Sequence, residues 1–94
     1  MRQSRADRED GYWEESATQL VALAQIHLSK KNRVRLARDR GQINLLRQAY
    51  ERGDSLPPIA LIQRADGGFD IDDGRHRFLA AELAGLTLIE AEIL

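Results

Sequence analysis

The feature that most constrains the fold of this chain is the series of prolines and glycines in its second half, because these residues end helices and strands. Pro57-Pro58 forbids helix and leads into an extended run over residues 59–64. Residues 65–68, Ala-Asp-Gly-Gly, are typical of a hairpin turn, because glycine adopts positive φ at little cost. Residues 69–72 then alternate apolar and acidic side chains, as a strand with one buried face does. The spacing predicts a β-hairpin here.

A helix is expected directly after this hairpin. Asp73-Gly74 ends the second strand, and residues 75–84 are nearly all apolar after Arg77. Gly85 is a natural C-terminal stop for that helix, and residues 86–94 return to the alternation of a strand.

The first half of the chain carries weaker signals. Apolar residues at i, i+3, i+6 and i+7 predict an amphipathic helix over residues 42–52, with Gly53 as its C-terminal glycine. Residues 20–28 are mostly apolar and fit either a short strand or the end of a helix. Residues 12–20 suggest a short amphipathic piece, and residues 1–10 a polar tail.

These elements predict one α+β domain with a small mixed sheet and packed helices over residues 20–94, preceded by a tail and short helix over residues 1–19. A chain of 94 residues has room for a single domain. It contains no cysteine, which excludes disulfides, thiolate metal sites and cysteine nucleophiles and favours the cytoplasm. No apolar run approaches the roughly 20 residues of a membrane span, and the first residues do not resemble a secretory signal.

Charge is distributed unevenly along the chain, although its net value is −1. Residues 30–40 hold six cations against one acid, Asp39, whereas residues 51–94 hold nine acids against four arginines. The basic run is either a solvated face or a surface that contacts nucleic acid. Its cations are Lys30, Lys31, Arg33, Arg35, Arg38 and Arg40.

The strand-to-helix junction, Asp-Asp-Gly-Arg-His-Arg at residues 72–77, is the most informative segment. Free N–H groups and the dipole at a helix start attract anions, and Gly74 lets a phosphate approach the backbone. His76 and Arg77 can donate hydrogen bonds to phosphate oxygens. The alternative is a helix cap in which the arginines pair with Asp72 and Asp73.

The order of motifs resembles the ParB/sulfiredoxin superfamily, in particular its ParB-like nuclease domains. The resemblance rests on Leu-Pro-Pro-Ile at residues 56–59, the Asp-Gly-Arg-His-Arg box, the alanine-rich helix and Ala-Gly-Leu at residues 84–86, and it covers residues 20–94. It implies a nucleotide site, with ATP or CTP as the ligand, in which Gly74, Arg75, His76 and Arg77 cradle phosphates. It also implies that Arg77 reaches over the phosphates, while Arg75 points outward. Further polar contacts would come from the preceding segment, through Arg40, Gln42, Asn44 and Gln48.

Departures from the family pattern narrow the function. A sulfiredoxin needs a cysteine between the glycine and the histidine of the box, where this chain has Arg75. The free-serine kinases of the superfamily carry an upstream glutamate as general base, and residues 26–34 contain no acid. A ParB centromere protein continues into a helix-turn-helix domain and a dimerisation domain. We therefore expect a nucleotide-binding ParB-like module for DNA, plasmid or phage maintenance, with DNA or a second copy of the chain as further candidate partners.

Two alternatives remain at this stage. One is an enzyme, a nuclease or nucleoside-triphosphate hydrolase, in which Asp72, Asp73 and His76 act with Mg²⁺. Strand alternation would place Asp70 and Asp72 on one face and Asp73 on the other. The second alternative is a non-catalytic module that contacts DNA or protein, with the box serving as a salt-bridged cap.

Overall fold

The structure is a computed structural model that describes residues 18–94. Its strands form one mixed sheet in the order β1-β5-β3-β4-β2. β1 is antiparallel to β5 and β3 to β4, whereas β3 is parallel to β5 and β2 to β4. The expected α+β class with a small mixed sheet is confirmed. The strands are β1 (Thr18–Ala22), β2 (Ile26–His27), β3 (Ile59–Gln63), β4 (Phe69–Asp73) and β5 (Leu88–Ile93).

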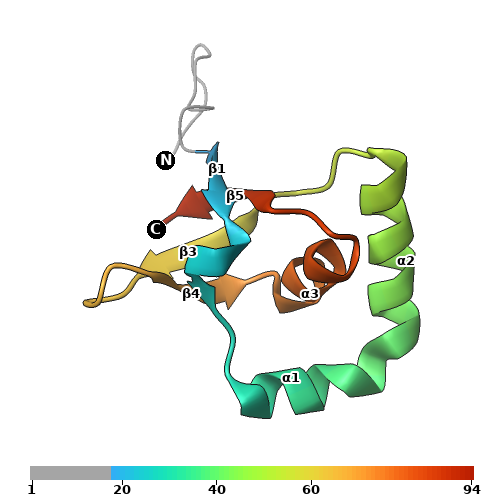
Figure 1. Cartoon of the computed structure of the whole chain (residues 1–94), viewed down its shortest axis with the longest axis horizontal. Coiled ribbons are helices and arrows are strands. Elements are labelled where there is room, and N and C mark those ends of the chain that lie inside the picture. Colours follow the sequence, from blue (N-terminus) through green and yellow to red (C-terminus); the bar gives the residue numbers. More distant parts are fainter. Residues whose placement is uncertain (1–17) are drawn as a thin grey trace, which may run out of the picture.

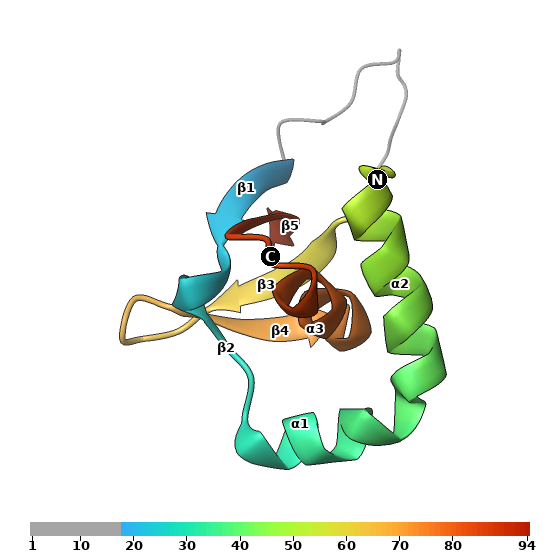
Figure 2. The same cartoon turned by 45° about the vertical axis from the view of Figure 1, so that its right-hand side comes forward.

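The helices gather on one side of this sheet. α3 lies between the sheet and α2, and α1 lies at the end of the molecule away from β1 and β5 (Figures 1 and 2). The helical segments are η2 (Leu23–Gln25), α1 (Lys30–Leu36), η3 (Ala37–Asp39), α2 (Arg40–Arg52) and α3 (Arg75–Leu83).

The core forms where α3 packs on β3. Ile59 and Leu61 are fully buried, and Phe78 of α3 is 1% exposed. Ala80 and Ala81 are also fully buried, and their small side chains let the helix lie close to the sheet. Burying a side chain the size of phenylalanine contributes about 1.5–3 kcal/mol, so this junction anchors the whole domain.

The second half of the chain forms the hairpin, helix and final strand that its prolines and glycines predict. The β3–β4 turn closes through a hydrogen bond from the Arg64 N–H to the Gly68 carbonyl, at 2.8 Å. Helix α3 begins at the expected Arg75 and ends one residue before the expected end. The final strand occupies residues 88–93, within the range that the alternation indicates.

The first half differs from expectation in three places. Residues 20–28 hold neither one strand nor a helix end, but two strands joined by the single turn η2. The basic run is helical: α1 and η3 lead directly into α2, which starts two residues before the expected helix and includes Gly41. Residues 18–20 of the expected short amphipathic helix belong to β1, while the rest of that segment and the polar tail lie outside the described residues.

A register shift changes the faces of the acidic residues in β4. Ile62 of β3 pairs with Asp70, but Ala60 pairs with Asp73, so one extra residue, Asp72, enters β4 between them. Asp70 and Asp73 therefore share the face opposite to the core. The simple alternation, which placed Asp73 on the other face, is wrong because it assumes a regular strand.

Across residues 18–94, no helix has the length and apolar character needed to cross a membrane.

Candidate functional site

The candidate site lies where β4 passes into α3. Gly74 precedes the first turn of the helix with φ of 104°, a left-handed conformation that side chains other than glycine rarely adopt. A Cβ on Gly74 would also lie 2.6 Å from Cγ2 of Ile59. The missing Cβ thus leaves space for the side chain of Ile59 in the core. From the sequence, the missing Cβ was expected to let an anion approach the backbone. Either way, only glycine fits this turn.

A pocket of about 480 Å³ opens beside this turn, between α3 on one side and α1 with η3 on the other. Gly74, Arg75 and His76 of the predicted box line it, together with Asp73. The facing wall comes from residues that the sequence argument did not assign to this site: Asn32, Leu36 and Asp39, together with Arg35 of the basic run.

His76 is held by a carboxylate from the facing wall. Its Nε2 lies 2.8 Å from Oδ2 of Asp39, a distance at which the ring N–H donates to the carboxylate. Asp39 stands 37 residues before His76 and was not among the residues expected at this site. This contact joins the end of η3 to the first turn of α3.

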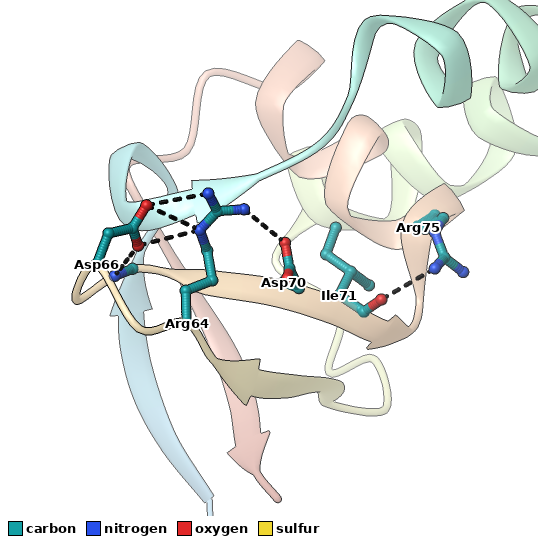
Figure 3. Close-up of polar contacts among 6 residues, drawn as sticks. Arg64, Asp66, Asp70, Ile71 and Arg75 are labelled. Atoms are coloured by element: carbon teal, nitrogen blue, oxygen red, sulfur yellow. Dashed lines mark hydrogen bonds and ion pairs between the residues drawn. The ribbon is translucent and has the colours of Figure 1, made fainter.

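The two arginines of the box point in different directions. Arg75 lines the pocket, and its guanidinium donates to the Ile71 carbonyl at 3.0 Å (Figure 3). Arg77 donates instead to the Pro58 carbonyl at 3.2 Å and lies 3.8 Å from Asp73. The Nε of Arg77 is buried without a hydrogen-bond partner in the described part of the chain. The expected orientations are therefore reversed: Arg75 faces the pocket and Arg77 turns toward β3.

The charge of Arg77 acts on Tyr50 of α2, which does not line the pocket. Burial raises the pKa of the half-buried Tyr50, and the nearby Arg77 opposes that rise. Arg77 thus belongs to the packing of α2, α3 and the start of β3.

Charges of both signs surround the pocket. Arg35 and Arg75 bring guanidinium groups to it, and Asp39 and Asp73 bring carboxylates. Asp72 is exposed and does not line it. Within residues 18–94, no three histidine or acidic side chains are close enough to hold a metal ion by themselves. A divalent ion at this pocket would take further oxygen ligands from water or from a bound molecule.

The polar residues expected from the segment before the prolines lie elsewhere. Gln42 and Gln48 are on α2, and Asn44 accepts a hydrogen bond from Arg47, also on α2. None of the three lines the pocket at the start of α3. Arg40 and Asn44 line a separate pocket of about 350 Å³ beside Leu83. The facing wall comes from α1 and η3 because the chain is already helical from Lys30.

A sequence signal for this extra helix exists. Ser29 caps α1, because its Oγ accepts a hydrogen bond from the Asn32 N–H at 3.1 Å. Serine before a polar run is a common N-cap, and recognising it would have placed Asn32, Leu36 and Asp39 on a helical segment.

A second polar cluster, at the β3–β4 turn, lies apart from the pocket. Arg64 donates to both Asp66 and Asp70, and Figure 3 shows these three side chains together at the turn end of β4, away from Arg75. The hydrogen bonds raise the pKa of Arg64 and lower the pKa of Asp66 to about 2. All three side chains find their partners within the cluster, which indicates a structural role in closing the turn.

Comparisons with known proteins identify the fold. No protein-family model matches the sequence, and no curated protein matches it either. A crystal structure of sulfiredoxin from Arabidopsis thaliana is similar, with a TM-score of 0.63 and 22% identity over 82% of this chain and 83% of that one. The C-terminally truncated chromosome-partitioning protein ParB from Caulobacter crescentus, complexed with CTP-γ-S, has a TM-score of 0.61 and 16% identity.

The match to ParB covers 82% of this chain but only 43% of the ParB chain. The chain therefore has a ParB/sulfiredoxin-like fold, as the order of its motifs indicated. The chain contains no cysteine.

Proposed function

We propose that this chain is a ParB-like module that binds a nucleoside triphosphate, with the phosphates at the start of α3. The observation that carries the proposal is the pocket of about 480 Å³ into which the Gly74 turn, Arg75, His76 and Arg35 converge. These groups come from two separate parts of the chain and meet only in the folded protein.

The physical chemistry of this pocket suits a polyphosphate. The first N–H groups of α3 have no partners within the helix, and the helix dipole adds about half a positive charge at that end. A charge-assisted hydrogen bond from a guanidinium to a phosphate contributes about 1.5–3 kcal/mol. Arg75 and Arg35 can each supply one from opposite walls of the pocket.

The similarity to ParB supports the choice of ligand. That protein was crystallised with CTP-γ-S, and its fold matches most of this chain. CTP is therefore the first nucleotide to test and ATP the second. The setting we propose is the maintenance of DNA, plasmids or phage.

Magnesium fits this proposal as a companion of the nucleotide. Mg²⁺ is usually bound by one or two carboxylates together with substrate phosphates, and the oxygens of Asp39 and Asp73 line the pocket. The ion would offset the repulsion between these carboxylates and the phosphates. His76 stays in contact with Asp39 through its Nε2, and its side chain lines the pocket.

Isothermal titration with CTP, ATP, GTP and UTP, each with and without Mg²⁺, tests the proposal. We expect binding of at least one nucleotide, with an affinity that depends on the triphosphate and rises with Mg²⁺. The proposal is contradicted if none of the four nucleotides binds at about millimolar concentration. A ligand that binds at that concentration would also stabilise the fold measurably, so thermal unfolding is a second readout.

Two arginine variants locate the site. Arg75→Ala should weaken nucleotide binding about tenfold or more, because it removes a donor that faces the pocket. Arg77→Ala should affect affinity less and stability more, since its guanidinium bonds the Pro58 carbonyl outside the pocket. Arg52→Ala, at the end of α2, is the matched control and should leave affinity unchanged. A larger loss of affinity in a folded Arg77→Ala protein would place the phosphates on the other side of α3.

The nuclease or hydrolase alternative, with Asp72, Asp73 and His76 as its catalytic residues, stays a prediction. Asp73 and His76 line the pocket, but Asp72 does not. Incubation of plasmid DNA and of nucleoside triphosphates with the protein and Mg²⁺ tests it directly.

A further inference from the structure

The structure separates the cations of the chain into two groups. Five of the six cations in residues 30–40 are exposed and have no carboxylate partner among the described residues. We call this surface the basic arm; its residues are Lys30, Lys31, Arg35, Arg38 and Arg40. The sixth cation, Arg33, donates to both carboxylate oxygens of Glu82, at 2.8 and 3.2 Å, and so belongs to the contact between α1 and α3.

Most arginines in the rest of the described chain are paired. Arg47 contacts Glu51, Arg52 contacts Asp54, and Arg64 contacts both Asp66 and Asp70. A solvated face that served only solubility would not need to concentrate its unpaired cations on one arm.

Three cations of the arm share one side of α1. At 100° per residue, Lys30, Lys31 and Arg35 fall within an arc of roughly 140° on α1, and the buried Leu36 lies outside that arc. Arg38 lies in η3 and Arg40 begins α2, and both side chains are exposed.

Two exposed acids lie far from the arm. Glu90 and Glu92 are exposed on β5, and α1 occupies the opposite end of the molecule from β5 in both views (Figures 1 and 2). Asp39, within the basic run, and Asp73 lie nearer, at the pocket that Arg35 also lines. The five cations of the arm still outnumber these two acids.

We propose that the basic arm binds the phosphate backbone of duplex DNA. A helix fits the major groove of B-DNA, which is about 12 Å wide, and long cationic side chains on an exposed helix reach the phosphates on either side. A membrane surface fits less well, because Val34 is the only large apolar side chain exposed on α1 and there is no aromatic residue in the helix. The surface is distinct from the proposed nucleotide site, apart from Arg35, which lines both.

Salt dependence is the first test. Binding to a labelled duplex of about 30 base pairs, measured by fluorescence anisotropy, should weaken by roughly a hundredfold between about 50 and 200 mM salt if four phosphates are neutralised. No binding at the lower salt concentration, or binding that salt leaves unchanged, would overturn the proposal.

Matched variants assign the binding to the arm. Lys30→Gln/Lys31→Gln should reduce affinity at least tenfold at low salt and make the slope of log K against log salt shallower by about 2. Arg47→Gln/Arg52→Gln removes the same charge from paired positions on α2 and should change affinity less than twofold. Equal losses for the two double variants would mean that net charge, and not the arm, governs binding, and would overturn the proposal.

The same variants separate this proposal from the nucleotide proposal. Neither lysine lines the pocket, so Lys30→Gln/Lys31→Gln should bind nucleotide as the unmodified chain does. Vesicles containing about 30% phosphatidylserine and sedimentation of the protein alone at low salt complete the test. Tighter binding to vesicles than to duplex, or self-association that the lysine variant abolishes without any binding of duplex, would assign the arm to a different partner and overturn the proposal.

Discussion

Gly74 is required for two independent reasons, its positive φ and the space that Ile59 occupies. With φ of 104° and Cγ2 of Ile59 at 2.6 Å from an added Cβ, any other residue would have to strain the backbone and displace a fully buried side chain. The glycines that follow the ends of helices have a positive φ but no close neighbour at the Cβ position. Gly85 has φ of 82°, but nothing lies within 4 Å of its Cβ position.

This difference gives a prediction. Gly74→Ala should lower the free energy of unfolding by about 2–4 kcal/mol, the sum of backbone strain and overpacking. Gly85→Ala should cost about 1–2 kcal/mol, because only the strain applies. Urea unfolding followed by circular dichroism measures both. Similar losses in the two variants would mean that Ile59 moves aside without cost.

At the scale of elements, the β3–β4 hairpin carries a carboxylate that couples its stability to pH. Hydrogen bonds from Arg64 and from the Gly68 N–H lower the pKa of Asp66 to about 2 in the folded chain, compared with about 3.9 in an unfolded one. A lowered pKa stabilises the fold above the unfolded value, and this stabilisation is lost as the pH falls toward the folded value.

We therefore expect the native chain to lose stability between about pH 4 and pH 2, and Asp66→Asn to make that loss smaller. Urea unfolding at a series of pH values gives the two profiles. Asp72→Asn, which removes an exposed carboxylate without an ion-pair partner in the described part of the chain, is the control. If the free energy of unfolding falls equally between pH 4 and pH 2 in Asp66→Asn and in the unmodified chain, the contacts of Asp66 at the turn do not stabilise the fold.

Helix α1 is the element that completes the pocket, and few contacts hold it. Seven residues are too short for a stable helix in isolation. The Ser29 cap, the buried Leu36 and the ion pair of Arg33 with Glu82 hold it, and the hydrogen bond to Glu82 raises the pKa of Arg33. That ion pair is about 40% exposed on both sides, so its contribution is about 1 kcal/mol or less. Leu36 is therefore the main anchor of α1.

Leu36→Ala should cost about 2–3 kcal/mol and should also weaken nucleotide binding, because α1 forms one wall of the pocket. Val34→Ala, at a side chain 64% exposed on the same helix, should change stability by less than about 0.5 kcal/mol. Hydrogen exchange of residues 30–39 together with nucleotide titration measures both effects. Unchanged exchange in Leu36→Ala would show that α1 is held by other contacts.

At the scale of the whole molecule, the fold brings two distant segments to one place. Asp39 and His76 are 37 residues apart in sequence, yet they contact each other beside the pocket, because α2 packs against α3 and returns the chain to the sheet. The proposed nucleotide site and the basic arm lie on adjoining sides of α1, and Arg35 lies at their boundary.

The amino-acid sequence determined the second half of the fold by itself. Pro57-Pro58, the glycine turn and Gly74 act through φ, ψ and missing N–H groups, which are local properties, so the hairpin and α3 could be predicted from them. The same local chemistry marked the start of α3 as an anion site, and Gly74, Arg75 and His76 do line a pocket.

Only the tertiary structure decided what faces that pocket. The register shift at Asp72, the direction of Arg75 against Arg77, and the wall formed by α1 and η3 depend on how β3, α2 and α3 pack. Pairing is likewise a tertiary property. Arg33 and Lys31 are both cations of the basic run, but among residues 18–94 only Arg33 meets a carboxylate, that of Glu82, which stands 49 residues later in the chain. Local propensity carries no information about such contacts, because they join residues far apart in the sequence. Their distances are set by how the helices and strands pack.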